Sequence, residues 1–257
     1  MTTGWHAPSA RANQRADHTP GRLEDTTMAQ LTFHGHSAVE LRLGGRHVWI
    51  DPFLTGNPLS VVQADVVDAH AIVVTHGHND HFGDTIAIAR RTGAVVVASY
   101  EVTQHCVRHG VQNVQPGNIG GTIRLDGLSI TFTPAWHSSA FEDGDDVRYM
   151  GNPAGVVVRG EGKAVYHMGD TALFSDIRLI AERQGPIDVA LVPTGDRFTM
   201  GLADALTAAQ WINAKLSIPI HHSTFPIIES NAAEFVGRLT AQHLRAHELK
   251  PGETVEL

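Results

Sequence analysis

The chain has 257 residues, of which 42% are hydrophobic and 18% are charged. This composition is typical of a folded globular protein and excludes the disordered and fibrous classes. The formal net charge of −8 disfavours a general nucleic-acid-binding protein, because it leaves no basic surface to follow a phosphate backbone. The single cysteine, Cys106, excludes an intramolecular disulfide and a cysteine-rich zinc site, whereas the 17 histidines are unusual.

The hydrophobic pattern of the sequence indicates neither a membrane-spanning segment nor a targeting signal. No apolar run approaches the roughly 20 residues needed to cross a bilayer, and the N-terminus lacks the apolar centre of a signal peptide. We therefore expect a cytoplasmic protein that does not contact membranes. Residues 1–27 are polar and aperiodic and are expected to form a disordered extension, followed by a single domain over 28–257.

Short apolar segments rich in β-branched residues follow one another from Met28 onward, separated by turn residues. The predicted strands are 30–34, 38–43, 46–50, 71–75, 94–99, 122–125, 128–133, 154–159, 164–167, 189–193 and 216–220. The predicted helices are 85–92, 100–109, 176–183, 202–214 and 232–246. These connections are too short for eight βα units, so the pattern favours the α/β class, as a four-layer αβ/βα sandwich of two facing sheets covered by helices.

Four potential metal ligands follow the strand predicted at 71–75 within six residues: His76, His78, Asp80 and His81. Neutral imidazoles bind zinc and similar divalent ions, and a carboxylate adds negative charge to such a site. Burying these groups at a strand end is costly unless they find partners, and one metal ion satisfies several of them at once. The segment therefore predicts a metal site and not a polar surface loop.

This segment resembles the His-x-His-x-Asp-His signature of the metallo-β-lactamase superfamily, and the resemblance extends over the chain from Met28. Within the superfamily the sequence is most similar to the small metal-dependent hydrolases related to ascorbate-6-phosphate lactonase. Further matching stretches occur in the same order: FHGHS at 33–37, IDPFLTGN at 50–57, GDTALFSD at 169–176, GDRFTMG at 195–201 and IPIH at 218–221. Several separate matches in order are more specific than one motif.

The resemblance implies two metal ions and assigns seven ligands to them. The first ion is implied to bind His76, His78 and His137; the second, Asp80, His81 and His221; and Asp170 is implied to bridge the two. The three ligands outside the signature lie just past the ends of strands predicted at 128–133, 164–167 and 216–220. Loops at strand ends gather at one edge of a sheet, where sites are commonly built.

The sequence departs from the family pattern at two positions. His222-Ser223-Thr224-Phe225 stands where relatives carry Tyr-Asn-Thr-Phe, so His221 and His222 both remain candidates for the last ligand. We favour His221, because the match of Ile218-Pro219-Ile220 to the family pattern is unambiguous; adjacent side chains at a strand end point to opposite faces, so only one of the two should face the site. Arg197 stands where relatives commonly have Asn, which affects the charge that a substrate can carry.

Other polar residues receive structural or supporting roles. Asp51 is predicted to orient a metal ligand, with a turn cap as the alternative. His36 and Ser37 follow a glycine in a turn, where they could line the pocket or be structural, and they are assigned no chemistry. His105 and His109 are predicted to be surface histidines, although their spacing on a helix also permits metal binding.

The implied activity is hydrolysis by a hydroxide that bridges two divalent ions, zinc in the first place, with manganese or iron as alternatives. Asp170 would hold the ions together, and Asp80 would accept or orient the proton of the hydroxide. The expected substrate is an ester, lactone or phosphoester of a small polar metabolite, without nucleic-acid or membrane partners; the sequence also allows a homo-oligomer.

Two alternatives remain beside this activity. The first is a glyoxalase-type thioesterase, and the second is a non-catalytic metal-binding protein that kept the fold. A β-lactamase proper is disfavoured, because such enzymes do not use an aspartate at the position of Asp170. An oxygen-reducing di-iron protein is disfavoured too, since it needs a flavin-binding partner domain.

Overall fold

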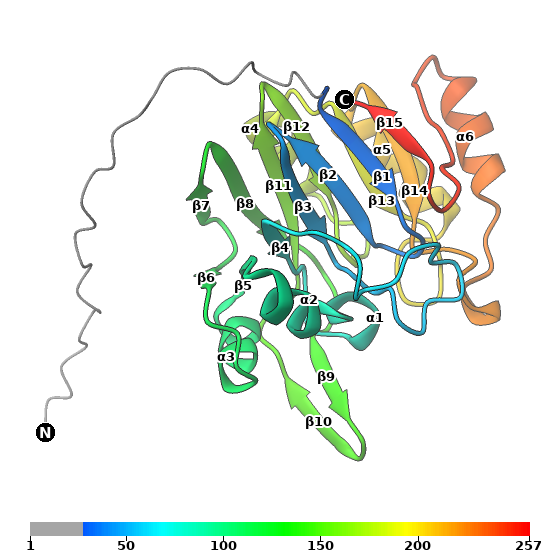
Figure 1. Cartoon of the computed structure of the whole chain (residues 1–257). Coiled ribbons are helices and arrows are strands. Elements are labelled where there is room, and N and C mark those ends of the chain that lie inside the picture. Colours follow the sequence, from blue (N-terminus) through cyan, green and yellow to red (C-terminus); the bar gives the residue numbers. More distant parts are fainter. Residues whose placement is uncertain (1–27) are drawn as a thin grey trace, which may run out of the picture.

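The computed structural model describes residues 28–257, which form two β-sheets packed face to face with helices on both outer faces (Figure 1). The predicted four-layer α/β sandwich is therefore confirmed. The extension expected at 1–27 lies outside the described residues, so the domain boundary stays a prediction. In the described part of the chain, no helix combines the length and apolar character needed to cross a membrane.

The N-terminal sheet has seven strands in the order β15-β1-β2-β3-β4-β5-β6, and three helices belong to this half of the chain. The strands are β1 (Gln30–Phe33), β2 (Val39–Leu43), β3 (Arg46–Ile50), β4 (Ala71–Val73), β5 (Val95–Ser99), β6 (Val114–Gly117) and β15 (Thr254–Glu256). The helices are α1 (Asn79–Phe82), α2 (Thr85–Thr92) and α3 (Tyr100–Arg108).

The C-terminal sheet has six strands in the order β14-β13-β12-β11-β8-β7. The strands are β7 (Thr122–Leu125), β8 (Leu128–Pro134), β11 (Ala154–Gly160), β12 (Lys163–His167), β13 (Val189–Pro193) and β14 (Leu216–Ile220). The helices of this half are α4 (Ile177–Gln184), α5 (Leu202–Ile212), the short 3-10 turn η1 (Pro226–Ile228) and α6 (Ala232–Thr240). A separate hairpin of β9 (Ala140–Asp143) and β10 (Asp146–Tyr149) extends away from the sandwich (Figure 1).

Three apolar layers hold the sandwich together. The central layer lies between the sheets and contains alternate residues of facing strands, such as Leu41 and Val48 from one sheet and Val156 and Val158 from the other. A second layer packs the helices α4, α5 and α6 on the C-terminal sheet, and a third packs α1 to α3 on the N-terminal sheet. The C-terminal strands β11 to β13 are buried on both faces, which explains their nearly continuous apolar sequences.

The directions of the strands place the carboxyl ends of several of them, and the loops that follow, at one edge of the sandwich. Strands β3, β4 and β5 run parallel to one another, as do β12, β13 and β14. Strand β8 is antiparallel to β11, which is antiparallel to β12, so β8 runs in the same direction as β12. In α/β sheets, ligands bind outside the carboxyl ends of the strands. That edge is therefore where a site is expected.

The observed elements differ from the predicted ones mainly where strands are short or exposed. The helix predicted over 232–246 ends at Thr240, and residues 245–247 instead run beside β14, with the Ser217 amide donating to the Arg245 carbonyl. Strands β6, β9, β10 and β15 and the one-turn helix α1 were not predicted. Each has five residues or fewer, too short for a clear hydrophobic period.

Candidate metal centre

Three histidines from two loops meet at the carboxyl edge of the sheets. His76 and His78 follow β4, and His137 follows β8. The His76 Nε2 and His78 Nδ1 atoms are 3.0 Å apart, and the His137 Nε2 and His78 Nδ1 atoms are 3.3 Å apart. Nitrogens that share a tetrahedral zinc ion lie roughly 3.3 Å apart, because each Zn–N bond is about 2.0–2.1 Å long. The three imidazoles therefore have the spacing of ligands to one ion.

A second group lies beside the first and contains Asp80, His81 and His221, with His36 behind them. Each of these residues offers a ligand atom within 4.8 Å of the others. The Asp170 carboxylate joins the two groups, since its oxygens lie 3.2 Å from His81 Nε2, 3.0 Å from His221 Nε2 and 3.5 Å from His137 Nε2. The structure thus brings together all seven residues that the sequence predicted as ligands.

Asp51 fixes the protonation of two of these histidines. Its Oδ2 accepts hydrogen bonds from His81 Nδ1 at 2.8 Å and from the Thr75 hydroxyl at 2.6 Å. The Thr75 oxygen in turn lies 3.0 Å from His76 Nδ1, which donates to it because the hydroxyl proton is already used. Both imidazoles therefore carry a proton on Nδ1 and direct Nε2 at the cluster. The contact of Asp51 with a candidate ligand agrees with the orienting role predicted for it.

Charges inside the cluster favour a cation. Burial lowers the pKa of His76 well below its usual value. Burial acts in the same direction on His81, but the carboxylates of Asp170 and Asp51 outweigh it and raise the pKa of His81 well above its usual value. Burial would raise the pKa of Asp170, yet His221 and His81 hold it well below its usual range. The field that favours a proton on His81 also favours a metal cation at its Nε2.

Buried polar atoms at the centre lack hydrogen-bond partners among the described residues. His81 Nε2 and Asp170 Oδ1 lie 3.2 Å apart, but neither makes a hydrogen bond of acceptable geometry. Leaving such groups unpaired in the interior costs about 1–3 kcal/mol each. A divalent ion would satisfy both atoms, and an imidazole-rich set with two carboxylates suits zinc, manganese or iron. The residues present therefore fit the two ions that the resemblance implies.

His36 is a contributor that the sequence did not reveal. It is buried, and its Nε2 donates a hydrogen bond of 3.1 Å to Asp80 Oδ2, while its Nδ1 lies 2.9 Å from the Thr224 hydroxyl. Burial lowers the pKa of His36 to about 4, so it is neutral near pH 7. His36 has a φ of 58°, a left-handed backbone conformation that cannot be predicted from the hydrophobic pattern of the sequence. Its side chain orients Asp80.

No other histidine of residues 28–257 belongs to these ligand groups. The ring of His222 contacts Ser223 and belongs to none of the groups that could hold a metal. His167 Nε2 donates to the Ser37 carbonyl at 2.9 Å and so links β12 to the loop after β1. The prediction of a surface position for His105 was wrong, because this ring is buried against Phe82 and Phe141.

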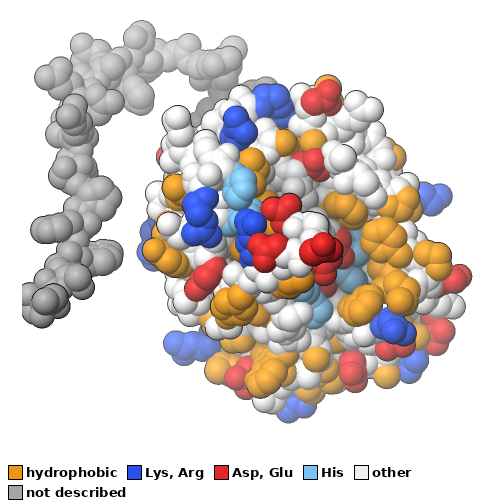
Figure 2. All heavy atoms as spheres, turned by 90° about the horizontal axis from the view of Figure 1, so that it is seen from below, with side chains coloured by type: hydrophobic (Ala, Val, Ile, Leu, Met, Phe, Trp, Pro, Cys, Tyr) orange, Lys and Arg blue, Asp and Glu red, His pale blue; other side chains and the backbone are white. Residues whose placement is uncertain are grey.

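A cavity of about 450 Å³ opens above the candidate ligands. It is lined by His78, Asn79, Asp80, His137, Ser138, Ala140, Glu142, Asp170, Phe198 and His221. Figure 2 shows this face of the molecule, where acidic side chains lie close to histidines. The volume lies within the range of about 300–1,000 Å³ that is typical of small-molecule sites.

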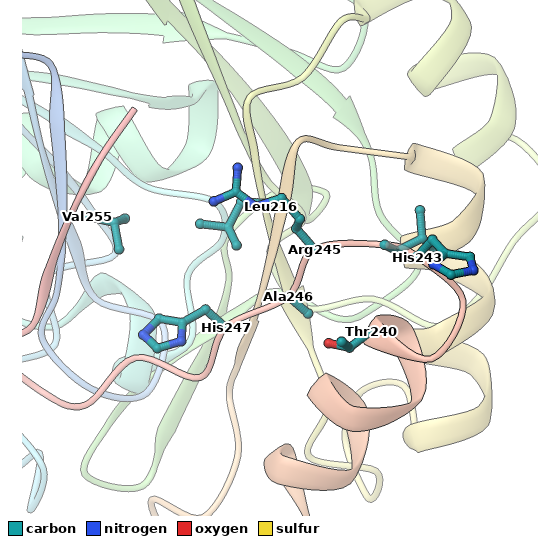
Figure 3. Close-up of a pocket in the computed structure, with 8 residues that line it drawn as sticks. Leu216, Thr240, His243, Arg245, Ala246, His247 and Val255 are labelled. Carbon is teal, nitrogen blue, oxygen red and sulfur yellow. The ribbon is translucent and has the colours of Figure 1, made fainter.

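A cavity of about 610 Å³ lies at the opposite side of the fold, between β14, the segment after α6 and β15 (Figure 3). Its lining includes none of the candidate metal ligands. The side chains of His243 and His247 point away from each other (Figure 3), and His247 pairs with Glu253 at 2.9 Å. Despite its size, this cavity has no convergent chemical groups, so the smaller cavity is the candidate site.

Comparison with known proteins agrees with this geometry. Residues 46–222 match the family described as "Beta-lactamase superfamily domain". A UPF0173 metal-dependent hydrolase of Shouchella clausii is 50% identical over 230 residues, which cover 89% of this chain and 100% of that protein. A UPF0173 metal-dependent hydrolase of Thermus thermophilus is 47% identical, over 90% of this chain and 100% of that protein.

Among solved structures, Igni18, a metallo hydrolase of the archaeon Ignicoccus hospitalis, has a TM-score of 0.81 and 36% sequence identity. The match covers 90% of this chain and 99% of that one. The relation to ascorbate-6-phosphate lactonase stays a prediction. Sequence, fold and cluster geometry together show that this chain belongs to the metallo-β-lactamase superfamily and, within it, to the UPF0173 metal-dependent hydrolase family.

Proposed function

We propose that the protein is a hydrolase whose centre binds two divalent ions and cleaves an ester, lactone or phosphoester of a small polar metabolite. The observation that carries the proposal is the position of Asp170, whose carboxylate contacts histidines of both ligand groups. His76, His78 and His137 would hold the first ion, Asp80, His81 and His221 the second, and Asp170 both. Zinc suits this imidazole-rich set best, with manganese and iron as alternatives.

Two divalent ions bound there would lower the pKa of a water molecule between them and polarise the bond to be cleaved. Around them the chain supplies orientation. Asp51 and Thr75 hold the imidazoles of His81 and His76 with Nε2 directed inward. The buried, neutral His36 donates to Asp80 and leaves the other carboxylate oxygen available to the site.

The electrostatic surroundings favour one of the two roles expected of Asp80. Burial would raise the pKa of Asp80, but the hydrogen bond from His36 and the charge of His81 hold it well below its usual range. A carboxylate with so low a pKa is a weak proton acceptor at neutral pH. Asp80 is therefore proposed to orient the attacking water by hydrogen bonding and not to retain its proton.

The substrate is proposed to be a small molecule, because the cavity of about 450 Å³ matches one in size. A thioester substrate of the glyoxalase type would use the same centre, and a cytoplasmic location is expected for either reaction. The complete ligand set argues against a non-catalytic metal-binding protein, because a protein that no longer catalyses a reaction is expected to lose some of the seven ligands.

The test combines metal content with turnover. Protein purified without chelator is expected to contain close to two equivalents of metal and to hydrolyse p-nitrophenyl esters or bis-p-nitrophenyl phosphate, with loss of activity on chelation and recovery on adding zinc or manganese. Asp170→Asn should retain the shape of the side chain but lose at least one ion and the activity. A folded protein that saturates at one equivalent would refute the binuclear centre. A fully loaded protein inactive on esters, thioesters and phosphodiesters would refute the hydrolase.

A further inference from the structure

The charges around the candidate cavity point to a preference among substrates. Resting on the proposed function, we propose that Glu142 makes the site selective against anions, so that its substrate is a neutral or cationic ester or lactone. Glu142 is the only charged residue in the described lining that is not a candidate ligand, and no Lys or Arg of residues 28–257 lines this cavity. The proposal thereby narrows the substrate class of the centre.

The backbone of Glu142 is fixed relative to the metal-binding loop. The side-chain amide of Asn79, which stands between His78 and Asp80, donates to the Glu142 carbonyl at 2.9 Å and accepts from the Glu142 amide at 2.9 Å. In this way Asn79 pairs with β9 as a neighbouring strand would. The backbone of Glu142 is consequently held beside the cavity that the residue lines, although the hairpin β9–β10 extends from the sandwich (Figure 1).

A second connection holds the base of the same hairpin. The Gly77 amide donates to the Ser139 hydroxyl at 3.0 Å, and the Met150 amide donates to the Ser139 carbonyl at 3.0 Å. A Cβ atom at Gly77 would lie only 2.3 Å from the Met150 Cβ, so the loop and the hairpin are in close contact. The hairpin and the metal-binding loop therefore form one unit.

The carboxylate is placed where its charge acts on the site. Glu142 shares the lining with His78 and Asp80, and its backbone is hydrogen-bonded to Asn79, which stands between them. Two divalent ions would carry four positive charges, while Asp80, Asp170 and the hydroxide formed from the bound water would carry three negative ones, so without a further acid the centre would attract anions. Glu142 offsets the remaining positive charge at the cavity entrance, and the Phe198 ring in the same lining adds no charge. Like charges repel more strongly in such a partly enclosed site than in bulk water.

Arg197 is the residue that could oppose this effect. Its guanidinium lies 5.8 Å from the centre of the Phe198 ring, but Arg197 itself is not part of the lining. An anion bound above the metal centre would therefore meet the Glu142 carboxylate in the lining and no lysine or arginine there. For this reason we assign the charge preference to Glu142 and include Arg197 in the test.

The kinetic test uses three esters that differ in the charge of the acyl group: p-nitrophenyl acetate, mono-p-nitrophenyl succinate and p-nitrophenyl 4-trimethylammoniobutyrate. In the metal-loaded wild type, kcat/KM should be lowest for the succinate ester. Glu142→Gln should raise the ratio of kcat/KM for the anionic to the cationic ester by about tenfold, and 0.5 M salt should shrink the difference between the proteins. Asp145→Asn removes the same charge from the hairpin turn, outside the lining, and should alter the ratio by less than about twofold.

A binding measurement separates this inference from the proposed function. Acetohydroxamate, succinate monohydroxamate and β-alanine hydroxamate carry the same metal-binding group and differ in distal charge, and their affinities for the metal-loaded protein can be measured by calorimetry. Glu142→Gln should again favour the anionic over the cationic compound by about tenfold. This shift would support the charge preference that we assign to Glu142 even if the loaded protein turns over no ester, thioester or phosphodiester, which would refute the hydrolase.

Two results would overturn the inference while the hydrolase stands. One is ester hydrolysis whose charge preference is the same in wild type and Glu142→Gln. The other is an anion preference in the wild type that Arg197→Gln abolishes, because the cation would then dominate the cavity.

Discussion

Replacing Asp51 by Asn tests the claim that this buried carboxylate controls the candidate ligands. Its two oxygens accept from the Thr75 amide at 2.8 Å, the Thr75 hydroxyl at 2.6 Å and His81 Nδ1 at 2.8 Å, and the residue is 0% exposed. An amide offers one oxygen in place of two, so either orientation turns an NH₂ group toward a buried donor. One unmatched buried donor costs about 1–3 kcal/mol of unfolding free energy. The weaker orientation of His81 should lower metal affinity by about 10- to 100-fold.

Two measurements on Asp51→Asn check these magnitudes. Urea unfolding of the metal-free proteins gives the loss of stability, and competition with a chromophoric chelator gives the affinity for zinc. Asp84→Asn is the control, because Asp84 accepts hydrogen bonds from the Leu54 and Thr55 amides but from no candidate ligand. Both bonds reach Asp84 Oδ2, whose place the asparagine oxygen can take, so the control should keep its stability and its zinc affinity. Equal zinc affinities of wild type and Asp51→Asn would refute the reasoning.

Three further predictions follow from individual residues. His221→Ala should lower the bound metal toward one equivalent, whereas His222→Ala should retain two, as measured by elemental analysis; the reverse result would move the ligand by one residue. Gly77→Ala should cost about 1–3 kcal/mol in urea unfolding, because its Cβ would overlap a methionine at 2.3 Å, while Gly237→Ala, with open space around it in α6, should gain about 0.5–1 kcal/mol. Burial would raise the pKa of Glu40, but His34 at 3.8 Å and the hydrogen-bonded His47 at 2.5 Å outweigh it and lower the pKa from 4.5 to about 2. An acid whose pKa is lower in the folded protein than in the unfolded chain stabilises the fold at pH values above its unfolded pKa. This contribution is lost as the pH falls toward the folded pKa. Metal-free Glu40→Gln should therefore be less stable than wild type at pH 7, by up to about 3 kcal/mol, and the gap should close between pH 4.5 and pH 2. A constant gap across this range would contradict the assignment.

The sequence predicted the elements that bury an apolar face and missed those that do not. Strands β2, β8 and β11 bury alternate or continuous residues, and their patterns gave nearly correct bounds. Strands β9 and β10 are largely exposed, so they have no buried face from which a period could be read. Strand β15 depends on pairing with β1 from the other end of the chain, which local sequence does not encode.

The candidate site was predictable where ligands cluster in the chain, and less so where they meet only in space. The spacing of the ligands from His76 to His81 was enough to predict a metal site, whereas the distant ligands came from the family resemblance. The role of His36 could not be read from the sequence, because it depends on a left-handed backbone conformation and on contact with Asp80 across two loops. Glu142 was missed for the same reason, since an exposed hairpin brings it to the cavity.

In the proposed centre, each ion would bind two residues from the segment that follows β4 in the N-terminal half, including α1, and two from loops of the C-terminal half. His76 and His78 would share the first ion with His137 and Asp170. Neither half of the chain alone completes a coordination shell. Metal uptake during folding should therefore follow the docking of the two halves and not the folding of either half alone. Removal of the metal by a chelator should loosen the carboxyl edge of the two sheets before the apolar layer between them.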